Sequence, residues 1–189
     1  GISWTKQTSP TSVSLNGITY SNSMFVAVGD SGTIFTSTDG ISWTKQTSPT
    51  SVSLNGITYG NSMFVAVGDS GTILTSTDGI SWTKQTSPTA VSLNGITYGN
   101  SMFAAVGDSG TIFTSTDGIS WTKQTSPVSV RLFGITYGNG MFVAVGYSGT
   151  IIVYVYTITN AVAIDAEGNM TVPVIDELIK RIEALEAKQ

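Results

Sequence analysis

Residues 37–49 read STDGISWTKQTSP, and the same thirteen residues return at 76–88 and at 115–127. The last ten of them, GISWTKQTSP, also open the sequence at residues 1–10. The tryptophans within these copies are therefore 39 residues apart: Trp4, Trp43, Trp82 and Trp121. A period near 40 residues indicates a repeat array, built either of paired helices or of four-stranded units.

The residues within each unit favour strands over helices. Every unit divides into short apolar or alternating runs that are bounded by turn residues. Residues 63–67, MFVAV, form a continuous apolar run, as in a strand that is covered on both faces. The pair Asp78-Gly79 predicts a type I′ hairpin turn, in which both central residues have positive φ. Only 11% of the residues are charged, which is low for a helical protein.

These features predict an all-β protein, a β-propeller of four 39-residue, four-stranded blades within residues 1–158. The repeats span residues 1–39, 40–78, 79–117 and 118–156. The sequence starts inside a blade, at its fourth strand, and the last repeat has only three strands. We therefore predict that residues 1–7 pair with the last repeat and close a four-bladed ring. The alternative is a larger ring that another chain completes.

The repeated turn resembles the Asp-box of sialidase-like and photosystem-assembly-factor-like propellers, Ser-x-Asp-x-Gly-x-x-Trp, although it is one residue shorter. This resemblance implies a propeller fold and a structural role for the turn, away from any catalytic face. It also implies that sialidase activity is absent, because that chemistry needs three arginines and the repeats contain only Arg131. The matching residues are Ser37, Asp39, Gly40, Trp43, Ser76, Asp78, Gly79, Trp82, Ser115, Asp117, Gly118 and Trp121.

The repeat pattern stops after Gly149, and the last unit is more apolar than the others. Tyr147 stands where the other repeats have aspartate, and Phe133 stands where they have asparagine. Terminal repeats are usually atypical because they do not pack against another repeat. The last unit is thus either a terminal blade of this kind or a docking surface for a partner or for the tail.

The tail predicts a strand and turn linker over residues 159–173, followed by a short coiled-coil-like α-helix over residues 174–189. Its apolar residues lie three, four and three positions apart, as in an a/d seam: Ile175, Leu178, Ile182 and Leu185. We expect self-association through this seam, as a trimer or dimer, with an intramolecular cap helix as the alternative. The tail also resembles the C-termini of phage tail-fibre and other virion structural proteins, where such segments trimerise or attach a fibre.

The composition argues against an enzyme and indicates no cofactor and no metal. There is no cysteine and no histidine, so the commonest general base and the commonest metal ligand are missing. The net charge of −4 offers no basic face for nucleic acid, and no apolar run is long enough to enter a membrane. The aspartates recur at equivalent turn positions of the repeats, where such residues usually have a structural role. A catalytic acid and its base need two different environments, and identical repeats do not provide them.

Binding is the function class that the repeats favour. Two sets of loops, GDSG and SPTSVS, are expected to share one face of a propeller and to repeat the same shallow polar site. The candidate ligand-binding residues are Asp30, Ser31, Asp69, Ser70, Asp108 and Ser109. We predict a tail-fibre-like virion or extracellular surface display protein that oligomerises and binds a glycan or protein receptor. The alternative is a propeller scaffold or assembly factor that binds protein partners.

Overall fold

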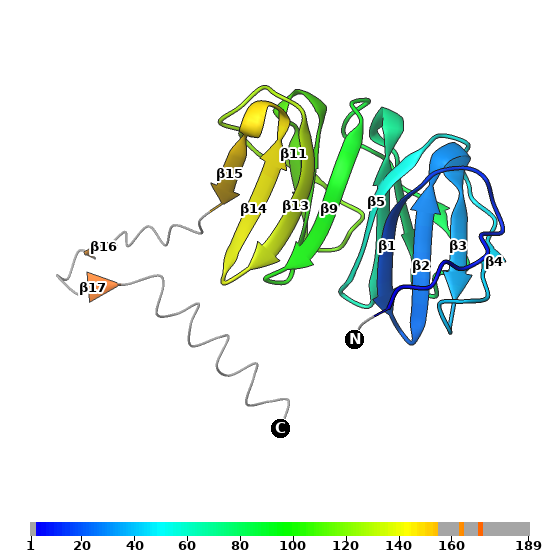
Figure 1. Ribbon diagram of the computed structural model, residues 1–189. Coiled ribbons are helices and arrows are strands. Elements are labelled where there is room, and N and C mark those ends of the chain that lie inside the picture. Colours follow the sequence, from blue (N-terminus) through cyan, green and yellow to red (C-terminus); the bar gives the residue numbers. More distant parts are fainter. Residues whose placement is uncertain (1–2, 155–162, 165–169, 172–189) are drawn as a thin grey trace. The chain divides into compact units, whose positions relative to one another are not determined.

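The computed structural model describes residues 3–154, 163–164 and 170–171 (Figure 1). Four antiparallel sheets, here called blades 1 to 4, follow one another along the chain. Blades 1 and 2 contain β1 (Leu15–Ser21), β2 (Met24–Gly29), β3 (Ile34–Ser37), β4 (Thr44–Lys45), β5 (Leu54–Gly60), β6 (Met63–Gly68), β7 (Ile73–Ser76) and β8 (Thr83–Lys84). Blades 3 and 4 contain β9 (Leu93–Gly99), β10 (Met102–Gly107), β11 (Ile112–Ser115), β12 (Thr122–Lys123), β13 (Leu132–Gly138), β14 (Met141–Gly146) and β15 (Ile151–Tyr154). A separate antiparallel pair is formed by β16 (Ala163–Ile164) and β17 (Met170–Thr171).

Each blade begins with a tight hairpin that asparagine makes possible. Between β5 and β6, Asn61 and Ser62 both have positive φ, 46° and 59°, which is the geometry of a type I′ turn. The type I′ turn predicted at Asp78-Gly79 is wrong, because only Gly79 has positive φ there. Six residues, 77–82, lie between the end of β7 at Ser76 and the start of β8 at Thr83, so this connection is a longer loop and not a two-residue turn.

The first strands of neighbouring blades pack directly against one another, β1 on β5, β5 on β9 and β9 on β13. A glycine in each strand permits this approach. A Cβ added at Gly95 would lie 2.9 Å from the Cα of Gly134, and one at Gly56 would lie 3.4 Å from the Cα of Gly95. Because backbone cannot move aside as a side chain does, these glycines set the spacing of the blades.

The hydrophobic core lies between blades. At the first junction, Val26, Val28 and Ile34 of blade 1 are fully buried against blade 2. They form one cluster with Leu54, Ile57, Phe64, Ala66 and Leu74, and Trp82 packs against it. Full burial stabilises each large aliphatic or aromatic side chain by about 1.5–3 kcal/mol. The second junction repeats the same cluster 39 positions later, with Trp121 in the place of Trp82.

The structure does not contain the predicted closed ring. Among the described residues, blade 4 has three strands, and residues 3–9 form no strand. In Figure 1, β1 and β15 lie at opposite ends of the row of blades, so the N-terminal segment is not beside blade 4. The physical reason is that the repeated sequence determines which strands are able to pair, but not whether the first and last blades come together. That depends on the angle between successive blades.

The loops predicted to share one face do so. A Cβ added at Gly32, in the turn between β2 and β3, would overlap the carbonyl oxygen of Thr50, in the connection from β4 to β5. Gly71 stands in the same relation to Thr89, and Gly110 to Val128. We call this edge of blades 1 to 3 the turn rim.

We expect Gly71→Ala to lower the free energy of unfolding by about 1–3 kcal/mol more than Gly149→Ala. Both glycines have positive φ, 68° and 71°, so both substitutions carry the same left-handed strain. Only the Cβ at position 71 meets a carbonyl oxygen, since nothing lies within 4 Å of the one at 149. Urea unfolding of both variants measures the difference, and equal losses would contradict the close packing of the rim.

Candidate functional site

The turn rim is built from one short element in each of blades 1 to 3, η1 (Asp30–Gly32), η2 (Asp69–Gly71) and η3 (Asp108–Gly110), and blade 4 has the equivalent element η4 (Tyr147–Gly149). In η1 to η3 the central serine has φ between 53° and 56°, and its side chain is exposed. The three serines, Ser31, Ser70 and Ser109, were predicted to bind a ligand. The structure places them in equivalent turns along one edge, with the aspartates beside them half-buried.

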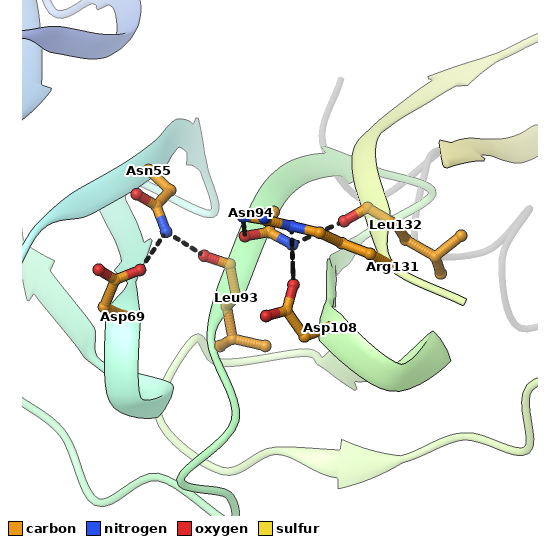
Figure 2. A network of polar contacts seen from close by, with 7 residues as sticks. All are labelled: Asn55, Asp69, Leu93, Asn94, Asp108, Arg131 and Leu132. Atoms are coloured by element: carbon orange, nitrogen blue, oxygen red, sulfur yellow. Dashed lines mark hydrogen bonds and ion pairs between the residues drawn. The ribbon is translucent and has the colours of Figure 1, made fainter. Parts of the chain in front are cut away.

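Each rim aspartate accepts a hydrogen bond from an asparagine in the first strand of its own blade (Figure 2). Asn55 Nδ2 donates to Asp69 Oδ1 at 2.9 Å and also to the carbonyl oxygen of Leu93, in the next blade, at 3.0 Å. One amide group thus joins a turn of blade 2 to a strand of blade 3. Asn16 and Asn94 make the same pair of bonds at the neighbouring junctions.

The last of these networks also contains Arg131. Its Nε lies 2.9 Å from Asp108 Oδ1, and its Nη2 donates to Asn94 Oδ1 at 3.2 Å (Figure 2). The guanidinium also stands over the ring of Phe133, 5.6 Å from its centroid. Arg131 replaces the serine found at the equivalent position of the other repeats, so blade 4 adds a positive charge to a rim that is otherwise acidic.

The rim therefore combines carboxylates that are engaged in structural hydrogen bonds with exposed serine hydroxyls. The pKa of Asp30 is lowered, mainly by the hydrogen bond from Asn16, so this carboxyl is ionised at neutral pH. Among the described residues, no three acidic groups lie close enough together to hold a metal ion. The arrangement presents carboxylates and hydroxyls that are able to accept or donate hydrogen bonds at the surface.

The Ser-Asp-Gly turns lie at the opposite end of the third strands. Asp78 Oδ1 accepts from the backbone N–H of Ser81 at 2.7 Å, from that of Ile80 at 2.8 Å and from the Ser76 hydroxyl. Trp82 Nε1 donates to the carbonyl oxygen of Gly79 at 2.9 Å, which fixes the indole over the core. The same bonds recur around Asp39 and Asp117, so these aspartates organise the loop.

Hydrogen bonds hold the pKa of these three aspartates below the ordinary value. The backbone N–H of Ser42, then that of Ile41, lowers the pKa of Asp39 to about 2. Ser81 and Ser120 are the largest contributors at Asp78 and Asp117, whose pKa is also lowered to about 2. Each carboxylate therefore favours the folded loop in its ionised form.

The sequence did not identify the rim asparagines or Arg131 as functional residues. Two signals were present. Each asparagine lies 14 positions before its aspartate, and both partners are lost together in the last repeat, to Phe133 and Tyr147. The predicted oligomerisation residues Ile175, Leu178, Ile182 and Leu185 lie outside the described residues, and their role stays a prediction.

No family model and no curated protein matches the chain. Solved structures do. The computationally designed Ika4 protein aligns with a TM-score of 0.60 and 12% identity over 76% of this chain and 92% of that one. YCF48 from Cyanidioschyzon merolae gives a TM-score of 0.66 and 18% identity, over 82% of this chain and 57% of that one.

A third similar structure is virginiamycin B lyase from Staphylococcus aureus, with a TM-score of 0.66 and 20% identity over 80% of this chain. The match spans 59% of the lyase, so the chain covers less than two thirds of both natural proteins. All three are β-propellers, and the likeness establishes that this chain has the fold of propeller blades. In the part of the chain that the structure describes, no helix has the length and apolar character of a membrane span.

We expect the stability of the protein to fall as the pH drops from about 4 to 2, partly through the Ser-Asp-Gly turns. Their folded pKa of about 2 lies below the ordinary 3.8, so their contribution is complete above 3.8 and is lost through pH 2. The variant Asp39→Asn/Asp78→Asn/Asp117→Asn keeps an acceptor oxygen without the charge. Thermal unfolding followed by circular dichroism should show that the melting temperature of this variant depends less on pH than that of the unsubstituted protein. The same pH dependence in both proteins would contradict this assignment.

We expect Asn55→Ala to lower the free energy of unfolding by about 1–3 kcal/mol, because it removes two partly buried hydrogen bonds at a junction. Asn16→Ala is the matched control. It removes the same two bonds at a site where the asparagine is exposed, and its loss should be smaller. Urea titration compares the two variants, and a neutral Asn55→Ala would show that the blades do not depend on this contact.

Proposed function

We propose that the chain is a non-catalytic propeller scaffold that displays the turn rim and binds protein partners through it. The observation that carries this proposal is the threefold repetition of one exposed turn, with Ser31, Ser70 and Ser109 in the same left-handed conformation. Because the turns belong to successive blades on a fixed core, their spacing is fixed as well. A partner that contacts two or three of them gains avidity from individually weak contacts.

The chemistry of the rim favours a protein partner. Exposed hydroxyls and hydrogen-bonded carboxylates suit backbone amides and basic side chains, and Arg131 with Phe133 adds a cationic and aromatic contact at one end. The intact repeats carry no aromatic residue in the rim loops on which a sugar would stack. Structurally similar propellers include YCF48 bound to D1 peptide and nidogen in complex with laminin, which supports the same class of partner.

The absence of catalysis is part of the proposal. Virginiamycin B lyase shares the fold and is an enzyme, but its histidine-to-alanine variant is described as catalytically inactive. The present chain contains no histidine, so it has no residue of that type to take the same part. Its rim and loop aspartates are instead engaged in the hydrogen bonds described above.

A virion or cell-surface location is the more specific form of the proposal. The resemblance of the tail to phage tail-fibre C-termini supports it. In that setting the seam of Ile175, Leu178, Ile182 and Leu185 would join chains, and the propeller would face a receptor. Deleting residues 174–189 should then reduce the native mass of the assembly.

We expect rim substitutions to remove partner binding in steps. Ser31→Asn, Ser70→Asn and Ser109→Asn keep a residue that tolerates positive φ but alter the exposed hydroxyl. The protein and its variants are applied to a peptide array and to a glycan array. We expect binding to the peptide array to fall several-fold with one substitution and to disappear with all three. Ser42→Asn/Ser81→Asn/Ser120→Asn, at exposed serines of the opposite loops, is the control. Binding to glycans alone, or peptide binding that the rim triple variant leaves unchanged, would overturn the proposal.

A further inference from the structure

Within the described residues, blade 4 has no fourth strand like the one that completes each of blades 1 to 3. In blade 2, Leu74 of the third strand lies opposite Lys84 of the fourth. Among the described residues, β15 pairs with β14 alone. Its outer edge therefore presents free backbone N–H and C=O groups to an incoming strand.

A cavity of about 260 Å³ lies between blades 3 and 4, next to this edge. Its walls include Ala104, Val106, Phe142 and Ile152. The equivalent positions at the first junction are Val26, Val28, Phe64 and Leu74, which form a closed cluster with Trp82 packed against it. The cavity thus corresponds to space that a tryptophan-bearing turn covers at the first two junctions.

Tyr154 fills this space only in part. Its ring centroid lies 6.3 Å from that of Phe142, close to the 6.4 Å between Phe103 and Trp121 in blade 3. Half of the tyrosine side chain nevertheless remains exposed. The room left beside it is apolar and adjoins the free edge, which suits an aromatic residue carried on a strand.

The chain carries a spare copy of the missing strand. Residues 1–7 read GISWTKQ, as do residues 40–46, 79–85 and 118–124, which form the turn and fourth strand of blades 1 to 3. Trp4 is 97% exposed, although its counterparts at 43, 82 and 121 are partly buried. The segment and the acceptor edge are therefore both without a partner among the described residues.

The two ends of the row are also uncovered, and they match. Leu15 of blade 1 is 46% exposed, whereas the equivalent Leu54, Leu93 and Leu132 are fully buried by the preceding blade. Ile151 of blade 4 is 69% exposed, whereas Ile34 and Ile73 are fully buried by the following one. The exposed face of blade 4 therefore matches the faces that a following blade covers elsewhere in the row. The exposed face of blade 1 matches the faces that a preceding blade covers.

We propose that two copies of the chain join head to tail, with residues 3–7 of one copy pairing with β15 of the other and Trp4 entering the cavity. Blade 1 of the first copy then packs against blade 4 of the second. Such a contact repeats the internal junctions, in which the fourth strand of one blade leads directly into the next blade. Because it joins two different faces, it closes into a ring or extends into a filament.

A second copy fits better than the chain's own N-terminus because of the connection to β1. Residues 46–53 carry the chain from the fourth strand of blade 1 straight to blade 2, and residues 7–14 have the same length. The blade that accepts residues 3–7 must therefore stand immediately before blade 1. No blade formed by the described residues stands in that place, and blade 4 lies at the far end of the row (Figure 1).

The substitutions in the last repeat suit a junction between separate chains. Phe133 and Tyr147 replace the asparagine and aspartate that link blades elsewhere, and both side chains are substantially exposed, 47% and 62%. At the proposed junction they add apolar surface where the internal junctions have polar bonds. A Cβ added at Gly134 would meet nothing nearer than 3.9 Å, so the outward side of this residue is open to a close strand approach like the one between Gly95 and Gly134.

Disulfide trapping tests the register, and the sequence has no cysteine to interfere. Lys45 lies opposite Phe35 in blade 1, so Lys6 should lie opposite Ile152 across the junction. Full-length Lys6→Cys and Ile152→Cys proteins are mixed and oxidised, and we expect a dimer that contains one of each. Lys6→Cys mixed with Val153→Cys, one residue out of register and on the other sheet face, should give at least tenfold less.

Adding Trp4→Ala to the Lys6→Cys protein should reduce the trapped dimer about tenfold or more, since the indole supplies the buried anchor. Gly134→Leu in the Ile152→Cys protein should do the same by blocking strand approach. The double variant Lys6→Cys/Ile152→Cys distinguishes the alternatives. A cross-link within one chain would replace the proposal with ring closure by the chain's own strand, and no specific 6–152 cross-link in any mixture would overturn it.

Discussion

The fold depends on apolar packing between one blade and the next. A blade is a single twisted sheet with two apolar faces, and it has no other element of its own to cover them. Leu54 is fully buried and Leu15 is 46% exposed, although both occupy the same position of the same repeat. The difference is the presence of a preceding blade, so the stability of each unit comes chiefly from its neighbours.

Polar contacts keep the blades in register after the apolar faces meet. The amide of Asn55 reaches both the Asp69 carboxylate and the Leu93 carbonyl oxygen, and it bonds well only if the two blades are correctly placed. The glycines in the first strands of the blades also fix the position of one blade on the next, because they allow the backbones to meet at a single close spacing. The proposed binding surface, the serines of the turn rim, belongs to turns that these structural bonds hold in place.

The 39-residue period was sufficient to predict strands, blades and the shared rim, because each depends on local residue patterns that recur three times. Closure of the ring was not predictable in this way, since it depends on small angles between blades that accumulate over the whole row. The rim asparagines were missed for a related reason. A repeated Asn or Asp in a Gly-rich segment is typical of a turn, and only the distance between Asn55 and Leu93 reveals a contact between blades.

Repetition also determines what the ends of the protein are able to do. Because the units are nearly identical, the first and last blades keep faces of the same kind as those that are buried between blades. The two ends of the row are therefore complementary to each other for the same reason that neighbouring blades are. The last repeat departs from this rule in a restricted way. Arg131 bonds with Asp108 and Asn94 toward the interior, while Phe133 and Tyr147 leave the outward side apolar. Arg131 thus strengthens the junction between blades 3 and 4, while the polar bonding residues are replaced only on the exposed face of blade 4. This distribution is expected if that face meets another chain.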